Sequence, residues 1–149
     1  MLRVVFLDVG GTLWPNAWPS RPNDNEERAA RLHQAVPSVA EQEATALVGV
    51  LAALDHPPGE QQQTALIVAE AIRKVIPRVP VPVHLVIDAM CLPARGRVQP
   101  FPGARELLSR LAGRGVRVVI VSNVLWRDGR AQRGDFEDLG LSGYVNDYV

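Results

Sequence analysis

The chain has 149 residues, a length that suits one domain or one domain with an insertion, and 47% of its residues are hydrophobic. This hydrophobic content excludes a largely disordered chain, because it supplies enough apolar side chains for a core. The 16 Lys and Arg residues balance the 16 Asp and Glu residues, so net charge gives no argument for a nucleic acid or a charged membrane as partner.

Cysteine content and hydropathy bear on where the protein works. Cys91 is the only cysteine, so no disulfide can form within the chain, which fits a reducing compartment. No apolar run approaches the ~18 residues that a membrane-spanning helix needs, and the first three residues enter a predicted strand without a signal-peptide pattern. We therefore expect a cytoplasmic protein with no membrane partner.

The first predicted element is a strand over residues 2–7. Its last four residues are all apolar and run directly into Asp8, a pattern typical of a parallel-sheet strand that is covered on both faces. Ligands bind at the carboxyl ends of such strands, so Asp8 lies where chemistry is expected. Gly10 and Gly11 allow a sharp turn there, although Asp is also a common turn residue.

Residues 15–99 are predicted to form an α-helical insertion. Prolines at three positions of residues 14–22 exclude a helix interior or a central strand, and Trp14 and Trp18 are expected to pack against the neighbouring domain. Four helices are expected: one at about residues 24–35, one that starts after Ser38 and ends before the break at residues 56–59, one at about 60–76 and one within 83–92. A capping box formed by Ser38 and Glu41 is expected to start the second helix.

The alternation of strands and helices resumes after a linker at residues 93–100. The expected elements are a helix that starts with Pro102 in its first turn and ends at Gly113 or Gly115, a strand at 116–121, a helix at 130–139 and the start of a third strand at 144–149. This order predicts an α/β fold with an open, Rossmann-like parallel sheet. Residues 1–14 and 100–149 form this discontinuous core, and an insertion at 15–99 can close over the strand ends as a lid.

Small polar side chains follow both predicted strands. Asp8 and Thr12 follow the first, and Ser122 and Asn123 follow the second, so parallel strands bring them to one edge of the sheet. A carboxylate can act as a nucleophile toward a phosphoryl group or an activated carbon. A Ser hydroxyl and the backbone N–H groups at a helix start suit an oxyanion, although Ser122 and Asn123 alone indicate only an ordinary cap.

Together these features resemble the haloacid dehalogenase superfamily of hydrolases. Residues 8–12, Asp-Val-Gly-Gly-Thr, are similar to the family's first motif, Asp-x-Asp-Gly-Thr at a strand end. Residues 118–122 are similar to its second motif, an apolar strand that ends in Ser or Thr, and the helical block is similar to the cap that follows motif one. The resemblance extends over essentially the whole chain.

The resemblance implies a role for each of these residues. Asp8 is the nucleophile that forms an aspartyl intermediate, Thr12 supports the loop, and Ser122 hydrogen-bonds the transferring group with Asn123 beside it. It also implies a small phosphorylated or halogenated molecule as substrate. Mg²⁺, held by Asp8 and the backbone carbonyl of Gly10, is the implied cofactor.

Two departures from the family pattern are visible. Gly10 stands where the phosphatases carry a second Asp as general acid/base, a group worth ~10²–10⁴ in rate, whereas other branches, such as dehalogenases, carry other residues there. The basic third motif is missing, because Lys74 is the only lysine and lies in the helical block. None of the acids after Ser122 follows an apolar strand as the fourth motif requires, so we expect a core that is incomplete at its C-terminus, as in a fragment or a protein that has lost catalysis.

Two other classes of function remain open. A non-catalytic, truncated core would bind only a ligand or a partner chain, and an open sheet near Val149 would favour self-association through its exposed edge. Residues 8–12 also resemble the first phosphate loop of actin-like sugar kinases. In those proteins the loop joins two strands of a hairpin, whereas residues 13–22 here carry three prolines and no alternating pattern.

Overall fold

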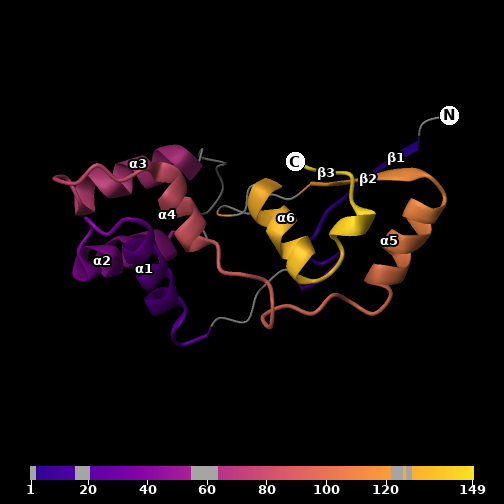
Figure 1. Cartoon of the computed structure of the whole chain (residues 1–149), viewed down its shortest axis with the longest axis horizontal. Coiled ribbons are helices and arrows are strands. Elements are labelled where there is room, and N and C mark those ends of the chain that lie inside the picture. The colour runs from indigo at the N-terminus through magenta and orange to yellow at the C-terminus, as the bar shows by residue number, and fades with distance from the viewer. Residues whose placement is uncertain (1–2, 16–20, 55–63, 122–125, 127–128) are drawn as a thin grey trace. The chain divides into compact units, whose positions relative to one another are not determined.

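The computed structural model of the chain, drawn in Figure 1, describes residues 3–15, 21–54, 64–121, 126 and 129–149. Two compact units are present, residues 1–19 together with 93–149 and residues 20–92. In the described part of the chain, no helix combines the length and the apolar character that crossing a membrane requires.

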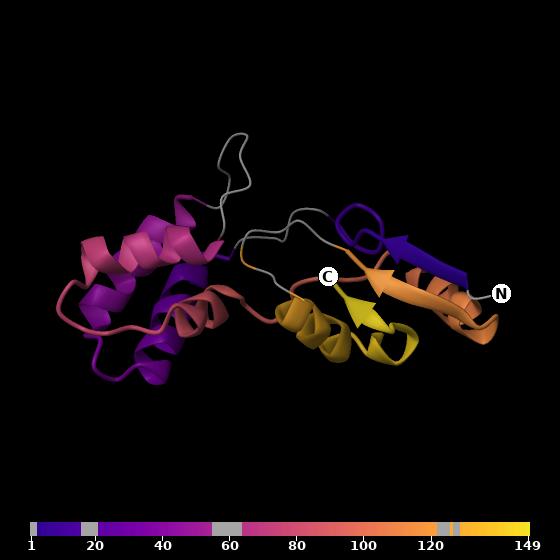
Figure 2. The same cartoon turned by 90° about the horizontal axis from the view of Figure 1, so that it is seen from above.

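The first unit contains a parallel sheet. Its strands are β1 (Arg3–Leu7), β2 (Val116–Ile120) and β3 (Asp147–Tyr148), in the order β1-β2-β3. Val5 pairs with Val118 and Leu7 with Ile120, and all three arrows in Figure 2 run in the same direction. Helices α5 (Ala104–Gly113) and α6 (Gly129–Asp138) and the short 3₁₀ helix η1 (Ser142–Tyr144) complete the unit. The predicted α/β fold with a parallel sheet is therefore confirmed.

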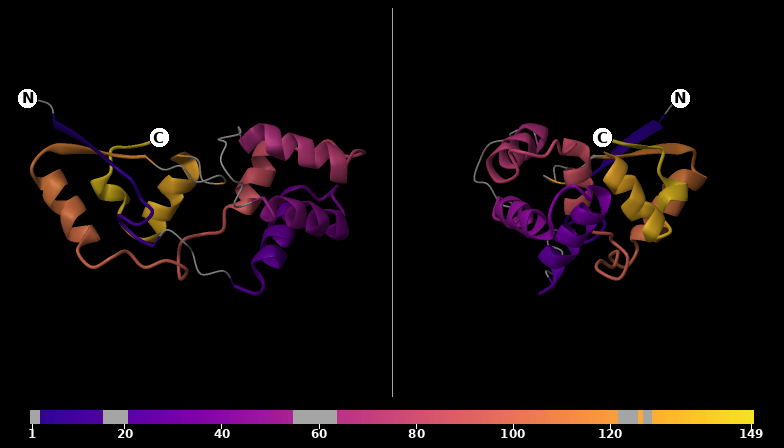
Figure 3. Two further views of the ribbon diagram at one scale, coloured as in Figure 1. Left: turned by 180° about the vertical axis from the view of Figure 1, so that it is seen from behind. Right: turned by 60° about the vertical axis from the view of Figure 1, so that its left-hand side comes forward.

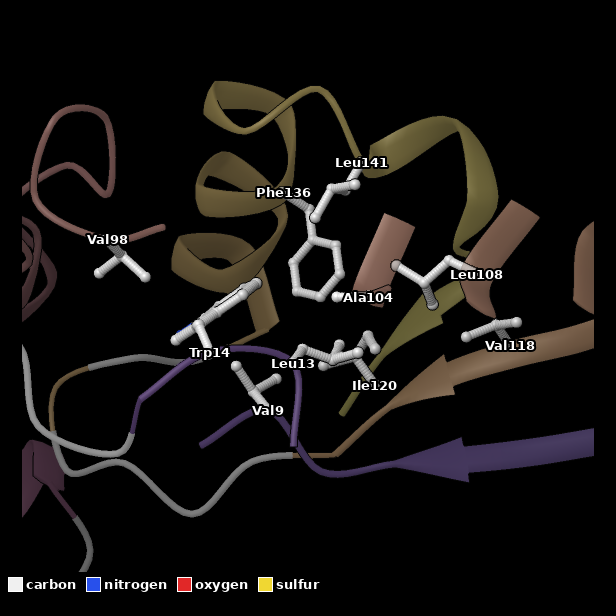
Figure 4. Close-up of a cluster of buried hydrophobic side chains, with 10 residues drawn as sticks. All are labelled: Val9, Leu13, Trp14, Val98, Ala104, Leu108, Val118, Ile120, Phe136 and Leu141. Carbon is white, nitrogen blue, oxygen red and sulfur yellow. The ribbon is translucent and has the colours of Figure 1, made fainter. Parts of the chain in front are cut away.

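One hydrophobic cluster forms the core of this unit. Its buried members come from the loop after β1, from α5, from β2 and from α6 and the turn after it: Val9, Leu13, Trp14, Val98, Ala104, Leu108, Val118, Ile120, Phe136 and Leu141. Figure 4 shows the side chains of Val118 and Ile120 on the same side of the sheet as both helices. The helices and the loop after β1 therefore share one face of the sheet.

The expectation that β1 is covered on both faces is wrong. Val5 and Leu7 are partly buried against the cluster, whereas Val4 is 41% exposed and Phe6 is 67% exposed. Alternate side chains of a strand point to opposite faces, and the cluster packs only against the face that carries Val5 and Leu7. β1 is also an outer strand of the sheet that the described residues form. The apolar side chains of β1 therefore lie alternately on one covered face and one exposed face.

The second unit is helical, and Figure 3 shows its helices grouped together. Its elements are α1 (Asp24–Ala35), α2 (Glu41–Ala52), α3 (Thr64–Val75) and α4 (Val83–Met90). The predicted apolar stripe of α2 is confirmed, because Ala44, Leu47, Val48 and Leu51 are all buried. Side chains from α1 bind the C-terminal carbonyls of α4: Arg28 Nε donates to Met90 O (3.2 Å) and Arg31 Nη2 donates to Asp88 O (3.0 Å).

Two helix starts differ from the prediction. α2 begins with the backbone N–H of Ala40 donating to Glu43 Oε2 (3.0 Å), so the predicted pair of Ser38 and Glu41 is wrong by two residues. α5 begins at Ala104, after Gly103 with φ 88°, so Pro102 precedes the helix. In both places a nearby residue decides the start: Val39, before the cap of α2, is fully buried, and Gly103 is left-handed. Residues 60–63, the start of the helix predicted at 60–76, lie outside the described residues.

Candidate active site

The candidate site begins where the chain leaves β1. Asp8 follows the last residue of that strand and is exposed. The pairing of β1 with β2 continues one step further at this edge, because Val121 N donates to Leu7 O (2.9 Å). Leu7 and Val121 therefore lie together at the edge of the sheet where Asp8 follows β1. The side chains of the second predicted motif that follow Val121 lie outside the described residues.

A closed turn carries the chain on from Asp8. The carbonyl oxygen of Val9 accepts from the backbone N–H groups of Thr12 (3.2 Å) and Leu13 (2.8 Å), and Gly11 N donates to Trp14 O (2.7 Å). Gly11 has φ 71°, in the left-handed region where a side chain is disfavoured. The predicted sharp turn is therefore present. Thr12 is exposed on it, whereas its apolar neighbour Leu13 is completely buried.

Trp14 closes the turn and packs inside the same unit. Its side chain is 3% exposed, and its ring centroid lies 5.0 Å from that of Phe136 in a tilted arrangement at 54° (Figure 4). The expectation that Trp14 packs against the neighbouring domain is wrong, because the indole fills the core beneath the Asp8 turn. Trp18 lies outside the described residues.

Sequence reasoning missed two aromatic residues near this turn. The ring of Phe136 also meets Tyr148 edge to face, with centroids 5.4 Å apart at 72°. The one available signal is that Phe136 is the only aromatic residue in the helix predicted at 130–139. Trp14, Phe136 and Tyr148 thus form an aromatic row from the turn through α6 to β3.

Tyr148 lies at the β3 end of this row of rings. Burial raises the pKa of its phenol to about 12, although the guanidinium group of Arg133 lies 5.2 Å from the ring centroid and opposes the rise. The buried hydroxyl of Tyr148 has no hydrogen-bond partner among the described residues. Gly129 is packed tightly against this residue, since a Cβ added there would lie 2.8 Å from Tyr148 O.

The remaining predicted residues fall into two groups. Ser122 and Asn123 lie outside the described residues. Gly10 belongs to the turn and pairs with Trp14 in a parallel bridge. Among the residues that the structure describes, no three His, Cys, Asp or Glu side chains come together as a metal cage.

The fold and the turn define a class of protein: α/β proteins with a parallel sheet and a carboxylate at the carboxyl end of one of its strands. A family model of haloacid dehalogenase-like hydrolases matches residues 2–149. Because the match extends over nearly the whole sequence, the chain belongs to the haloacid dehalogenase-like hydrolase family, as the motifs indicated. A comparison with curated proteins gives no match.

Proposed function

We propose that the protein is a hydrolase that works through a covalent intermediate on Asp8 and acts on a small phosphorylated or halogenated molecule. One observation carries the proposal: the hydrogen bond from Val121 N to Leu7 O (2.9 Å) pairs the ends of the two strands that precede the candidate motifs in the sequence. Exposure of Asp8 supports it too, because a nucleophile must reach its substrate. Membership of a hydrolase family supports the same reaction class.

The proposed chemistry has two steps. An oxygen of the Asp8 carboxylate attacks the phosphorus or carbon centre, a bond forms to that centre, and the leaving group departs with its electron pair. Water then hydrolyses the aspartyl intermediate and releases the product. Thr12 supports the turn, and Ser122 with Asn123 binds the group that is transferred. Because Gly10 provides no acid, the leaving group must depart without proton donation from that position.

Mg²⁺ is the proposed cofactor for the phosphatase form of this reaction. The donor atoms fit it in kind, because the Asp8 carboxylate and the Gly10 carbonyl are hard oxygen ligands. Mg²⁺ often binds through one or two protein oxygens and keeps several waters, so a closed protein cage is not required. Bound there, it would supply charge neutralisation for a phosphate group.

The helical unit is proposed to be the family's cap. In sequence it lies between β1 and α5, so it is inserted directly after the turn that Asp8 starts. We propose residues 20–92, within the expected insertion at 15–99, as this cap, and residues 1–19 and 93–149 as the core, because Val98 belongs to the core cluster. A cap inserted there can exclude bulk water while Asp8 attacks the substrate. The single cysteine supports a cytoplasmic location for the enzyme.

The test of the function is the Asp8→Asn variant, measured with a panel of small phosphate esters and haloacids, with and without Mg²⁺. We expect turnover to fall by roughly 10³-fold or more, because the amide is a poor nucleophile. The matched control is Asp138→Asn, which removes another exposed carboxylate of the same unit. Equal turnover in wild type and Asp8→Asn would disprove the covalent role.

An isotope experiment separates the two chemistries. A single turnover is run in H₂¹⁸O with enzyme in excess over substrate. Attack of water on phosphorus leaves the label in the released phosphate, whereas attack on the carbonyl carbon of an aspartyl ester leaves it in the Asp8 carboxyl group. Mass spectrometry of the phosphate and of the peptide that contains Asp8 therefore distinguishes phosphatase from dehalogenase.

A second candidate function is self-association through a sheet edge. The outer strand β1 favours it, because Phe6 is 67% exposed and the strand is five residues long, whereas β3 has two residues. Outer strands offer backbone groups to another chain. We propose β1 as the edge involved, in place of the edge near Val149.

A further inference from the structure

We propose that Phe136 is a positioning residue for Asp8, which acts by holding Trp14 and through it the turn that follows β1. The proposal rests on the proposed function, because it assigns Phe136 a part in the rate of the Asp8 reaction. Phe136 is completely buried in α6, so we do not expect its side chain to touch the substrate. Its effect is expected to pass through the packing of two rings.

The first step is the dependence of the turn on Trp14. Both backbone groups of Trp14 take part in the turn, because Trp14 O accepts from Gly11 N (2.7 Å) and Trp14 N donates to Val9 O (3.4 Å). The neighbouring carbonyl of Leu13 accepts from Phe101 N (2.8 Å), which ties the turn to the segment before α5. A shift of Trp14 therefore moves the backbone that fixes the residues next to Asp8.

The second step is the way in which the Trp14 side chain is held. The indole is 3% exposed and lies against Phe136 with ring centroids 5.0 Å apart. Two further contacts hold Phe136 itself. Its ring packs against the ring of Tyr148, with centroids 5.4 Å apart, and its backbone carbonyl accepts a hydrogen bond from Leu141 N (2.7 Å). Close-packed rings of this kind cannot move without opening a cavity, so the position of Phe136 limits the position of Trp14.

The third step concerns the second motif. α6 begins at Gly129, after the segment that carries Ser122 and Asn123, and Phe136 lies in this same helix. One side chain therefore links the turn after β1 to the helix after β2. Small errors in the placement of reacting groups are costly, since a misplacement of about 1 Å can lower a rate ~10²-fold. Phe136 is thus suited to hold the nucleophile turn in a fixed relation to α6.

The experiment compares Phe136→Leu, Trp14→Phe and Trp14→Leu with the control Leu108→Val, which opens a cavity in the same cluster from α5. Two quantities are measured for each folded variant: the exchange rates of the Gly11 and Leu13 amides by NMR, and kcat and KM on the best substrate of the Asp8 panel. We expect Phe136→Leu to exchange these amides faster and to lose about 10–100-fold in kcat with little change in KM. Trp14→Phe, which keeps a ring, should lose less than Trp14→Leu.

Each outcome decides one proposal. Faster exchange and lower kcat in Phe136→Leu, with Leu108→Val close to wild type, support the positioning role. Unchanged amide exchange in Phe136→Leu, or an equal effect in Leu108→Val, overturns it. A wild-type protein without Asp8-dependent turnover overturns the proposed function and the catalytic part of this inference, while the amide exchange still decides whether Phe136 holds the turn.

Discussion

The phenol of Tyr148 combines a buried hydroxyl without a described partner and a pKa raised to about 12 by burial. The charged form of a phenol is the deprotonated one, so a raised pKa means that the folded state holds the proton more tightly than the unfolded state. This contribution to stability is fully present below pH ~10, the pKa of an ordinary tyrosine, and is lost as the pH rises toward 12.

Tyr148→Phe tests this residue directly. We expect the free energy of unfolding at pH 7 to rise by about 1 kcal/mol, because the variant keeps the ring contact with Phe136 and removes a buried group that lacks a partner. The phenolate absorbance titration should also lose its step near pH 12. Urea denaturation at pH 7 and pH 10.5 measures the free energy of unfolding and its pH dependence, and an absorbance titration measures the phenol itself. A variant that is less stable than wild type at pH 7 would show that the hydroxyl is satisfied in solution.

The first residue of helix α6, Gly129, packs closely against the backbone of Tyr148. A Cβ at Gly129 would lie 2.8 Å from the backbone oxygen of Tyr148, and a backbone atom cannot move aside without disturbing β3. Gly134 lies within the same helix and has nothing within 4 Å of an added Cβ. The two glycines are therefore a matched pair for one substitution.

Opposite effects are expected from alanine at these two positions. Gly129→Ala should lower the free energy of unfolding by about 1–3 kcal/mol through overpacking. Gly134→Ala should raise it by about 0.5–1 kcal/mol, since alanine loses less backbone entropy in a helix. Thermal unfolding followed by circular dichroism measures both. Equal shifts in the two variants would contradict the close approach of Gly129 to Tyr148.

The sequence predicts where helices and strands lie better than it predicts which faces of them are buried. The 3.6-residue spacing of Ala44, Leu47 and Leu51 defines the buried face of α2, because only one side of a helix can meet the core. In β1 every position from Val4 to Leu7 is apolar, so no alternation marks which face is covered, and the exposure of Phe6 was not predictable.

The candidate site divides in the same way. The position of Asp8 follows from local rules, since a strand end and a glycine turn are encoded within a few adjacent residues. The place of Trp14 depends on Phe136, which is distant in sequence, and no local pattern links two such residues. The two-residue shift of the α2 cap to Ala40 arises similarly, because tertiary packing of Val39 fixes where the helix starts.

At the scale of the whole molecule, the chain forms two units, each with its own buried side chains and each with exposed apolar ones. Phe6 on β1 is 67% exposed and Leu66 on α3 is 65% exposed, so exposure alone would give both apolar side chains the same tendency to associate. They differ in their backbone. Phe6 belongs to an outer strand of the sheet that the described residues form, and the N–H and C=O groups on the outer side of such a strand can extend the sheet into another chain, whereas the backbone of α3 is bonded within the helix.

Self-association is therefore expected to depend on Phe6 and not on Leu66. Phe6→Glu places a charge on the outer strand, which should weaken association by tenfold or more, corresponding to about 1.4 kcal/mol. Leu66→Glu removes a similarly exposed side chain and serves as the matched control. Sedimentation velocity over a range of protein concentrations compares the two variants with wild type. A concentration-independent monomer for wild type would exclude the β1 edge as an interface, and an equal loss in both variants would indicate general hydrophobic adhesion instead of strand pairing.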